Sequence, residues 1–452
     1  MYFNDNDFKP KLSAMQPNIQ RDKLFVASCL ALMVTGLSFG IRAGNLPQWA
    51  AEFNLNATEL SAITATAFWG FPVAVIIGGM VVDAIGMKKL LVMAFLFHLS
   101  GIILTVYAGS FGSAFWPLFL STLLIGIANG TVEAACNPLV SALYPGNKTT
   151  KLNHFHLWFP GGIVIGSLII HFYGKYIGGN LGDYKPWQVE VATMIIPTLI
   201  YGVLFAGLKF PPTERVAAGI STGEMYKSLL TPLFLFMILC MFGTAITELY
   251  TQQWIPVLLK NVTSEPILLL TLTTGVMVIG RAFAGPVVHR LAPQGVLLMS
   301  AILAATGIYL LGHTSGNMLY VASIIFGLGV CYFWPTMLGF VSENIPKTGA
   351  VGINLMGGVG MFSVSIYTLL MGGFYDRIVA GKLPQGANLK DYAGAAPGSS
   401  EALALSGAQA AAGPEILNTT LVIPIILVVA FSGLVIYMRG RRRLQVLTPA
   451  NV

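Results

Sequence analysis

Charged residues are scarce in this chain of 452 residues, because Asp, Glu, Lys and Arg together make up only 10% of it. Hydrophobic residues make up 55%, and the mean hydropathy is +0.74. A water-soluble protein of this length needs more charge than this to cover its surface. The composition therefore excludes a soluble globular protein and predicts a chain that lies largely within a lipid bilayer.

Cysteines and catalytic motifs are also few. The four cysteines fall in apolar stretches, and they indicate neither a disulfide framework nor a metal cage. The HExxH motif of zinc peptidases and the GxxxxGK motif of ATP-driven pumps do not occur. We therefore expect no enzyme, no metal and no cofactor, and we keep a membrane-embedded enzyme, a receptor and a scaffold as alternatives to a transporter.

Twelve long apolar stretches occupy most of the chain. A helix needs about 20 residues to cross a hydrocarbon core about 30 Å thick, so each stretch can form one transmembrane helix. We predict an N-terminal six-helix bundle at 1–210, a cytoplasmic linker at 211–227, a C-terminal six-helix bundle at 228–438 and a basic cytoplasmic tail at 439–452. The Ala-, Gly-, Ser- and Pro-rich segment from Lys382 to Glu415 is predicted to be a mobile outward loop, with a functional lid as the alternative.

The basic residues predict the orientation of the chain. With twelve crossings, 17 of the 25 Lys and Arg residues fall on the side of both termini. Because cytoplasmic loops carry the excess of basic residues, we expect both termini in the cytoplasm and a multi-pass protein of the cell (inner) membrane. We also expect the protein to function as a monomer. The net charge of +7 then reflects orientation, and the scatter of these residues excludes a nucleic-acid partner.

Landmarks in the first half of the chain recur in the second half. Pro145 is followed eight positions later by Asn153, and Pro346 is followed eight positions later by Asn354. Matched proline and polar positions about two hundred residues apart indicate an internal membrane repeat, with a binding site near the midplane between its halves. Ordinary helix packing, in which Gly and Pro are common, is the alternative reading.

Ionisable residues within the apolar stretches are the first candidates for function. Glu133 lies midway along the fourth stretch, where a charged side chain costs about 3 kcal/mol to insert. Burial favours the neutral acid, which suits a reversible proton carrier, so Glu133 is the predicted coupling residue. A structural carboxylate locked to a basic partner is the alternative.

Glu248 and Arg281, in the seventh and eighth stretches, are further candidates for proton coupling. Arginine stays charged, so Arg281 is expected to pair with Glu133 or Glu248, or to reach the membrane surface instead. Arg42, near the outer end of the first stretch, is expected to reach the lipid headgroups. If Arg42 faces the cavity instead, an anionic substrate becomes attractive.

Amide and aromatic side chains form the predicted substrate site. Sugars present hydroxyl groups and apolar C–H faces, which amides and aromatic rings recognise. His154 and His156 are expected in a loop or interface, with a proton role as the alternative, and His98 is expected to be a packed or hydrogen-bonded helix residue. The substrate candidates are Asn45, Asn137, Asn153, Gln252, Gln253, Trp254, Tyr332, Trp334 and Asn354.

The loop between the second and third stretches carries a recognisable motif. Its string GGMVVDAIGMKK contains Gly79, Asp83, Gly86 and Lys88, and it resembles the glycine, acid, glycine and basic loop of the major facilitator superfamily. Glycines permit a tight turn, and an acid at a helix end can hold its partners in one state and release them in another. The four residues are therefore predicted to form a gate, with a solvated loop acid as the alternative for Asp83.

Three longer strings, VEAACNPLVSALYP, KLNHFHLWFPGG and IGRAFAGPVVHRLAPQGVL, resemble the fucose, galactose and glucose proton symporter branch of that superfamily. The resemblance implies an all-α membrane protein with twelve transmembrane helices in two pseudosymmetric six-helix bundles. It also implies that Glu133 is the coupling acid. The sequence departs from this branch at one position. Some members carry an acidic residue in the first span, and at that position this chain has Ala43, next to Arg42.

We therefore predict a secondary active transporter that imports a small polar solute, a monosaccharide, by proton symport with alternating access. The predicted partners are the solute, the proton and the lipid bilayer. Proton-driven export of an organic compound or anion, passive facilitated diffusion and coupling to sodium are the alternatives.

Overall fold

The computed structural model describes residues 19–55, 57–259, 262, 266–384, 389, 392, 395–396 and 398–447. These residues are almost entirely helical, and within these ranges only an isolated bridge between Leu181 and Tyr184 has strand-like pairing. Eleven of the helices are long and apolar enough to cross a membrane, and Leu268–Ala282 is a shorter apolar helix. The predicted all-α fold is confirmed, and twelve transmembrane helices are consistent with it.

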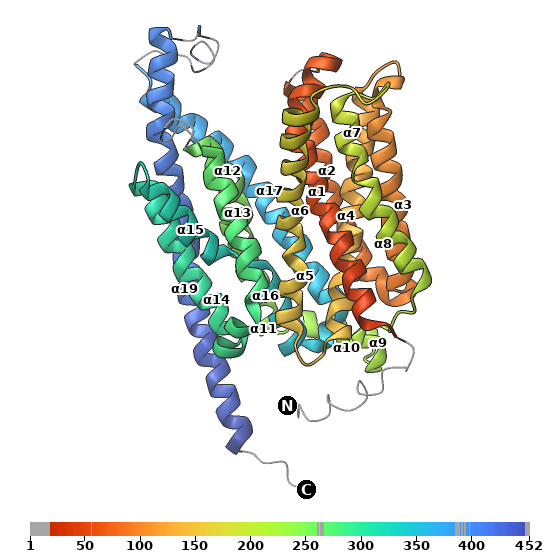
Figure 1. The fold of residues 1–452 in the computed structure, drawn as a ribbon. Helices are drawn as coiled ribbons and strands as arrows, with labels where there is room; N and C mark the ends of the chain where they lie inside the picture. The colour runs from red at the N-terminus through yellow and green to blue at the C-terminus, as the bar shows by residue number, and fades with distance from the viewer. Residues whose placement is uncertain are drawn as a thin grey trace. The chain divides into compact units, whose positions relative to one another are not determined.

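Figure 1 shows the helices in the order in which they follow along the chain. Their bounds are α1 Arg21–Phe53, α2 Ala57–Ile85, α3 Met87–Val106, η2 Ala108–Ser110, α4 Phe115–Leu143, α5 Lys148–His156, α6 Trp158–Phe172, η3 Tyr173–Ile177, α7 Pro186–Ala192, α8 Ile195–Gly207, α9 Glu214–Ala217, α10 Thr222–Leu229, α11 Pro232–Ala245, η4 Ile246–Tyr250, α12 Thr251–Leu258, α13 Pro266–Ala282, α14 Ala284–His313, α15 Met318–Val330, α16 Phe333–Asn344, η5 Pro346–Thr348, α17 Gly349–Lys382 and α19 Ser400–Leu447.

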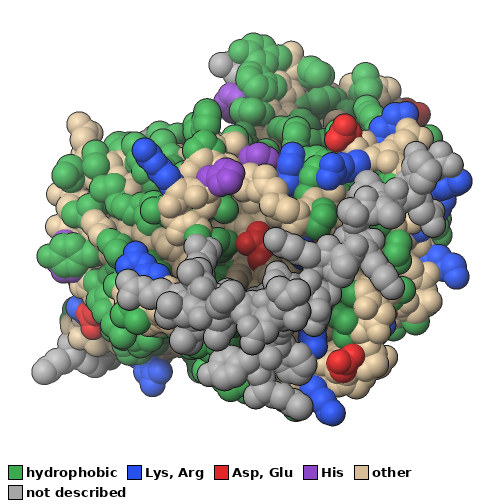
Figure 2. Space-filling view, turned by 90° about the horizontal axis from the view of Figure 1, so that it is seen from below, with side chains coloured by type: hydrophobic (Ala, Val, Ile, Leu, Met, Phe, Trp, Pro, Cys, Tyr) green, Lys and Arg blue, Asp and Glu red, His purple; other side chains and the backbone are tan. Residues whose placement is uncertain are grey.

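By their mutual contacts the residues form two units. Unit 1 contains residues up to 237 together with 338–361, and unit 2 contains 238–337 together with the residues from 362 onward. Residues 338–361 belong to unit 1 because they bond to α4 and α5; Asn354, for example, donates a hydrogen bond to the carbonyl of Ala134 over 2.9 Å. On the part of the face in Figure 2 that the described residues form, basic side chains lie among hydrophobic and other side chains.

Glycines allow α1 and α6 of unit 1 to cross closely. A Cβ atom added at Gly36 would lie 2.9 Å from the Cα atom of Gly162, and it would also collide with the carbonyl oxygen of Phe159. Within a bilayer the hydrophobic effect does not drive helices together, so membrane helices associate through close van der Waals packing of this kind. The crossing fixes α1 against α6 and so positions the polar residues that both helices carry.

Unit 2 contains a sharp break within α14. Ala292 has a φ of +57°, and Pro293 follows it inside α14. Proline cannot continue the hydrogen-bond ladder of the preceding turn, so the chain bends there. The eighth span is therefore α13 plus the first turns of α14, and the ninth begins at Pro293.

The prediction of a mobile loop from Lys382 to Glu415 is wrong over much of its length. Helix α17 continues to Lys382, α19 begins at Ser400, and an ion pair of 2.9 Å joins Lys382 to Glu415. Alanine has the highest helix propensity, and its small side chain lets helices pack closely, so an Ala-rich segment can be helical and buried. The buried cluster here comprises Val379, Leu383, Ala408 and Ala412.

Candidate transport site

Glu133 lies in a chain of buried polar side chains in unit 1. Its side chain, on α4, is only 4% exposed, and the amide nitrogen of Asn137, one turn further on, donates to its Oε2 over 3.2 Å. The amide oxygen of Asn137 lies 2.9 Å from Nε2 of His156 on α5. Since an amide oxygen only accepts, Nε2 of His156 is the donor. His156 therefore orients Asn137, and Asn137 presents its N–H group to Glu133.

This arrangement corrects one prediction. His156 is 2% exposed, so its expected placement in a loop or interface is wrong, whereas His154 on the same helix is partly exposed. The reason is geometric: α5 packs against α4, and only one face of a nine-residue helix can meet Asn137. The spacing of the two histidines along the sequence gave no sign of which one would be buried.

Glu248 occupies an irregular turn in unit 2. It lies in the π-helical turn η4, which interrupts the seventh span between α11 and α12. π-Helical turns are rare in proteins, and many of those that occur lie at functional sites. Its Oε1 accepts from Nη2 of Arg281 over 2.8 Å, and its Oε2 accepts from the backbone N–H of Trp334 over 3.3 Å.

Arg281 is paired rather than extended to the membrane surface. It is 2% exposed, and besides Glu248 it donates from Nε to the carbonyl of Cys331 over 2.6 Å. The predicted pairing of Arg281 with Glu248 is therefore present in the structure. The alternative, in which Arg281 reaches the membrane surface, is wrong. A buried ion pair of this kind needs its remaining donors and acceptors satisfied, which the two backbone groups help to achieve.

The predicted substrate residues divide between the units. In unit 1, Asn45 is completely buried near Glu190, but its amide group forms no hydrogen bond within the described residues. Asn153 donates to the carbonyl of Thr149, and Asn354 donates to the carbonyl of Ala134. In unit 2, Tyr332 donates to the carbonyl of Gly280, and Trp254 stacks on Tyr250. Gln252 contacts the sulfur of Met277, Gln253 is exposed, and the indole of Trp334 is buried.

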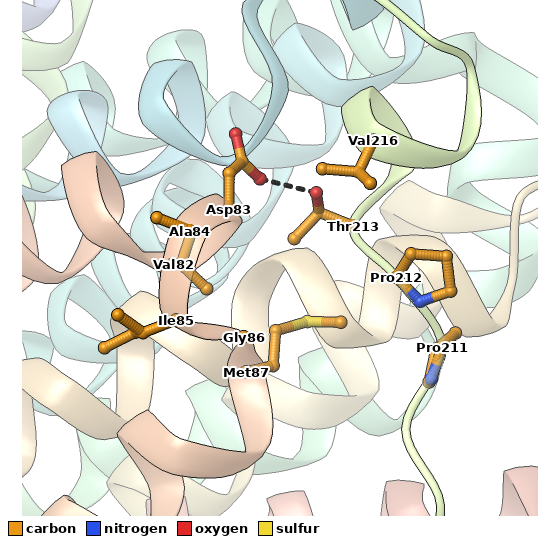
Figure 3. A pocket seen from close by; sticks show the side chains of 10 residues that line it. All are labelled: Val82, Asp83, Ala84, Ile85, Gly86, Met87, Pro211, Pro212, Thr213 and Val216. Atoms are coloured by element: carbon orange, nitrogen blue, oxygen red, sulfur yellow. Dashed lines mark hydrogen bonds between the residues drawn. The ribbon is translucent and has the colours of Figure 1, made fainter.

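The loop motif forms a network with the linker. The carboxylate of Asp83 at the end of α2 accepts from the hydroxyl of Thr213 (Figure 3). It also accepts from Nε of Arg215. Gly86 turns the chain with a φ of +87°, a conformation that favours glycine. Lys88 donates to the carbonyls of Ala206 and Leu208 at the end of α8, where a cation is favourable.

Gly79, the remaining motif residue, lies against α17. A Cβ atom placed on Gly79 would lie 2.6 Å from Cβ of Asn354, so only glycine permits this approach. The pocket beside Asp83 has a volume of about 250 Å³ and is lined by residues 82–87, 211–213 and 216 (Figure 3). None of the predicted substrate residues lines it, so we assign it to the gate motif and not to the solute.

The sequence reading missed a second set of contacts from the linker. Lys148 at the start of α5 forms an ion pair of 2.9 Å with Glu214 and donates to the carbonyl of Ser342 over 3.0 Å. Glu343 accepts from both the backbone N–H and the hydroxyl of Thr149. The mixed charge of the linker was the only signal, and it does not say which distant partners are met.

Comparison with known proteins identifies the family. The model described as Major Facilitator Superfamily matches residues 28–368. This chain belongs to the Major Facilitator Superfamily. The membership predicted from the loop motif is therefore confirmed.

Parts of the chain are also similar to two named sugar transporters. The chain is 29% identical over 206 residues to the galactose-proton symporter of Escherichia coli (strain K12), covering 42% of this chain and 41% of that protein. It is 29% identical over 175 residues to facilitated glucose transporter member 10 of Danio rerio, covering 38% of this chain and 32% of that one. The chain thus spans about a third to two-fifths of the length of these relatives.

The structural matches are longer but distant in sequence. FucP in the outward conformation matches with a TM-score of 0.66 and 17% identity, covering 89% of this chain and 98% of that one. The proton:xylose symporter XylE matches with a TM-score of 0.66 and 12% identity, covering 90% and 96%. These matches show the fold. As a member of the superfamily the chain is a multi-pass membrane transporter related to sugar:proton symporters, and not an enzyme.

Two polar residues of this superfamily member have placements that bear on function. His98 is completely buried between the hydroxyl of Tyr201 and Oδ1 of Asn129, each 2.8 Å away, which confirms the prediction of a hydrogen-bonded helix residue. Ser38 lies within a GLSFG string that matches the GxSxG pattern of serine hydrolases. It sits in the middle of α1 and donates to the carbonyl of Thr35, whereas the serine of that hydrolase motif sits on a strand-to-helix turn.

Proposed function

We propose that this chain imports a small polar solute, a monosaccharide in the first instance, together with a proton by alternating access. The observation that carries the proposal is the buried chain of Glu133, Asn137 and His156. Burial disfavours a charged carboxylate, whereas an amide donor stabilises it. These opposing effects are what a group that gains and loses a proton in each cycle requires.

In the proposed cycle the protonated carrier binds solute, closes and opens to the other side. Neutralising Glu133 removes the cost of enclosing a charge in a dry environment, so the loaded carrier crosses more readily than a half-loaded one. Glu248 is the less suitable coupling group, because Arg281 and the backbone of Trp334 both hold its charged form in place. We assign this pair to the support of unit 2.

The proposal is tested with the purified full chain in proteoliposomes. With the interior made alkaline, wild-type protein should accumulate a labelled monosaccharide from a panel above its outside concentration. Without a pH gradient, the same solute should only equilibrate. Equilibration under both conditions would indicate a passive facilitator, and efflux against a gradient would indicate an exporter.

The gate motif is proposed to regulate this cycle through Asp83. Arg215 and Asp83 are both mostly enclosed, with side-chain exposures of 13% and 8%. Replacing Arg215 with Ala leaves the carboxylate without this partner, and removing one member of a buried pair costs about 3 to 5 kcal/mol. We expect Arg215→Ala to lower the melting temperature of the purified protein and to slow solute exchange.

Lys209→Ala is the matched control, because Lys209 is an exposed cation close by in the chain. Its melting temperature and exchange rate should stay at the wild-type values. Equal effects of the two substitutions would remove the case for a gate at Asp83.

A further inference from the structure

Arg42 is a buried cation in unit 1 whose charge no carboxylate of the described residues balances. Its side chain is 8% exposed, which rules out the expected extension to the headgroups. In the described part of the chain no carboxylate forms an ion pair with Arg42 and no group hydrogen-bonds to it; every ion pair there involves other residues. Arg281, the other arginine inside a span, has its carboxylate partner at 2.8 Å.

An aromatic cluster surrounds this guanidinium. The Cζ atom of Arg42 lies 4.9 Å from the ring centroid of Phe39, one turn earlier on α1. Phe39 in turn meets Phe68 of α2 edge-on at 5.8 Å and Phe159 of α6 edge-on at 5.5 Å. All three rings are partly exposed, so their apolar faces and edges remain available to a ligand.

A ring face does not satisfy a buried guanidinium. A cation–π contact is worth about 0.5 to 2 kcal/mol, whereas a buried donor that is left without hydrogen bonds costs about 1 to 3 kcal/mol, and more when it is charged. Arginine also has five N–H donors in a planar fork, which a ring face leaves unbonded. A carboxylate is the group that matches this fork with two parallel hydrogen bonds.

We infer that Arg42, with Phe39, Phe68 and Phe159, binds the carboxylate of an anionic solute, namely a small polyhydroxylated monocarboxylate such as an aldonate or uronate. The inference rests on the proposed function, because it assigns the substrate class of the same carrier. A monoanion fits better than a phosphate, since one guanidinium balances one charge and no second cation accompanies Arg42 in the described residues. The C–H face of the solute would lie against the phenyl rings.

The charge balance gives this inference a signature. One carboxylate carries −1 and one proton carries +1, so their joint import moves no net charge. Uptake should then depend on the pH gradient and not on the membrane potential. Import of a neutral sugar with a proton would instead move one positive charge and respond to both.

The test uses the full chain in proteoliposomes with pairs of solutes that share a carbon skeleton: galacturonate with galactose, and gluconate with glucose. Wild-type protein should bind and take up the carboxylate at concentrations about tenfold or more below those needed for its neutral partner, as loss of a bidentate charged contact predicts. A potential set by potassium and valinomycin should leave carboxylate uptake unchanged. Arg42→Gln should abolish the preference, and Arg42→Lys should keep part of it.

Arg377→Gln, at an exposed position on α17, is the control and should keep the preference. If Arg42→Gln does not fold, galacturonate against its methyl ester on the wild-type protein decides, because the ester keeps the sugar ring and its hydroxyl groups but carries no charge. Proton-driven uptake of neutral sugars with no preference for any carboxylate would overturn the inference and leave the proposed function standing. Uptake of carboxylates without any effect of the pH gradient would overturn the proposed proton coupling and leave Arg42 as an anion site.

Discussion

Glu133→Gln is expected to abolish accumulation of solute against its gradient while leaving exchange of solute across the membrane intact. Glutamine has nearly the shape of a neutral glutamic acid and can accept from Asn137, so the fold and the binding site should survive. Glutamine cannot bind and release a proton, so the variant cannot use a pH gradient to accumulate solute. Counterflow and uptake under an alkaline interior, measured on the same vesicles, separate the two effects.

Glu190→Gln supplies the matched control for this experiment. Glu190 is also a buried acid of unit 1, at 1% exposure, but it lies on α7 and forms no part of the chain to His156. Its replacement should leave accumulation unchanged. If Glu133→Gln accumulates solute like the wild-type protein, Glu133 is not the coupling group.

Arg281→Met is expected to destabilise the protein severely, by about 3 to 5 kcal/mol, because it leaves Glu248 charged and buried in unit 2. Methionine has a similar length and keeps much of the packing. The double variant Glu248→Gln, Arg281→Met should recover much of this loss, since the uncompensated charge is gone. The measurement is a double-mutant cycle on the wild-type protein, Arg281→Met, Glu248→Gln and the double variant. It compares their melting temperatures and folded yields in one detergent.

Arg290→Met is the control for loss of positive charge, because Arg290 is exposed at the break in α14. It should be close to neutral. A double variant as unstable as Arg281→Met would show that the bond of Arg281 to the carbonyl of Cys331, and not its pairing with Glu248, holds this part of unit 2 together.

Much of the fold follows from one physical constraint that is visible in the sequence. Apolar stretches of sufficient length can only be helices in a bilayer, because their backbone groups must bond within the segment. The same constraint singles out Glu133, Glu248 and Arg281, since ionisable groups at membrane depth need buried partners. The sequence also named Glu248 as a possible partner for Arg281.

Other features depend on contacts that are remote in sequence. Arg215 reaches Asp83 across 132 positions, and Lys148 reaches the carbonyl of Ser342 across 194, so no local pattern announces either contact. The burial of His156 depends on which face of α5 meets α4. Arg42 was expected at the surface because arginine can extend its side chain there, and its position over Phe39 became visible only in the folded chain.

The most direct test of the account is whether protons enter with the solute. Vesicles containing the wild-type protein, with no initial pH gradient, are mixed with a solute that the panel has shown to be transported, and the pH of a weakly buffered outer medium is recorded. The account predicts that the medium becomes more alkaline as solute enters, and that Glu133→Gln exchanges the same solute with no change in pH. Solute entry by the wild-type protein without any movement of protons would contradict it.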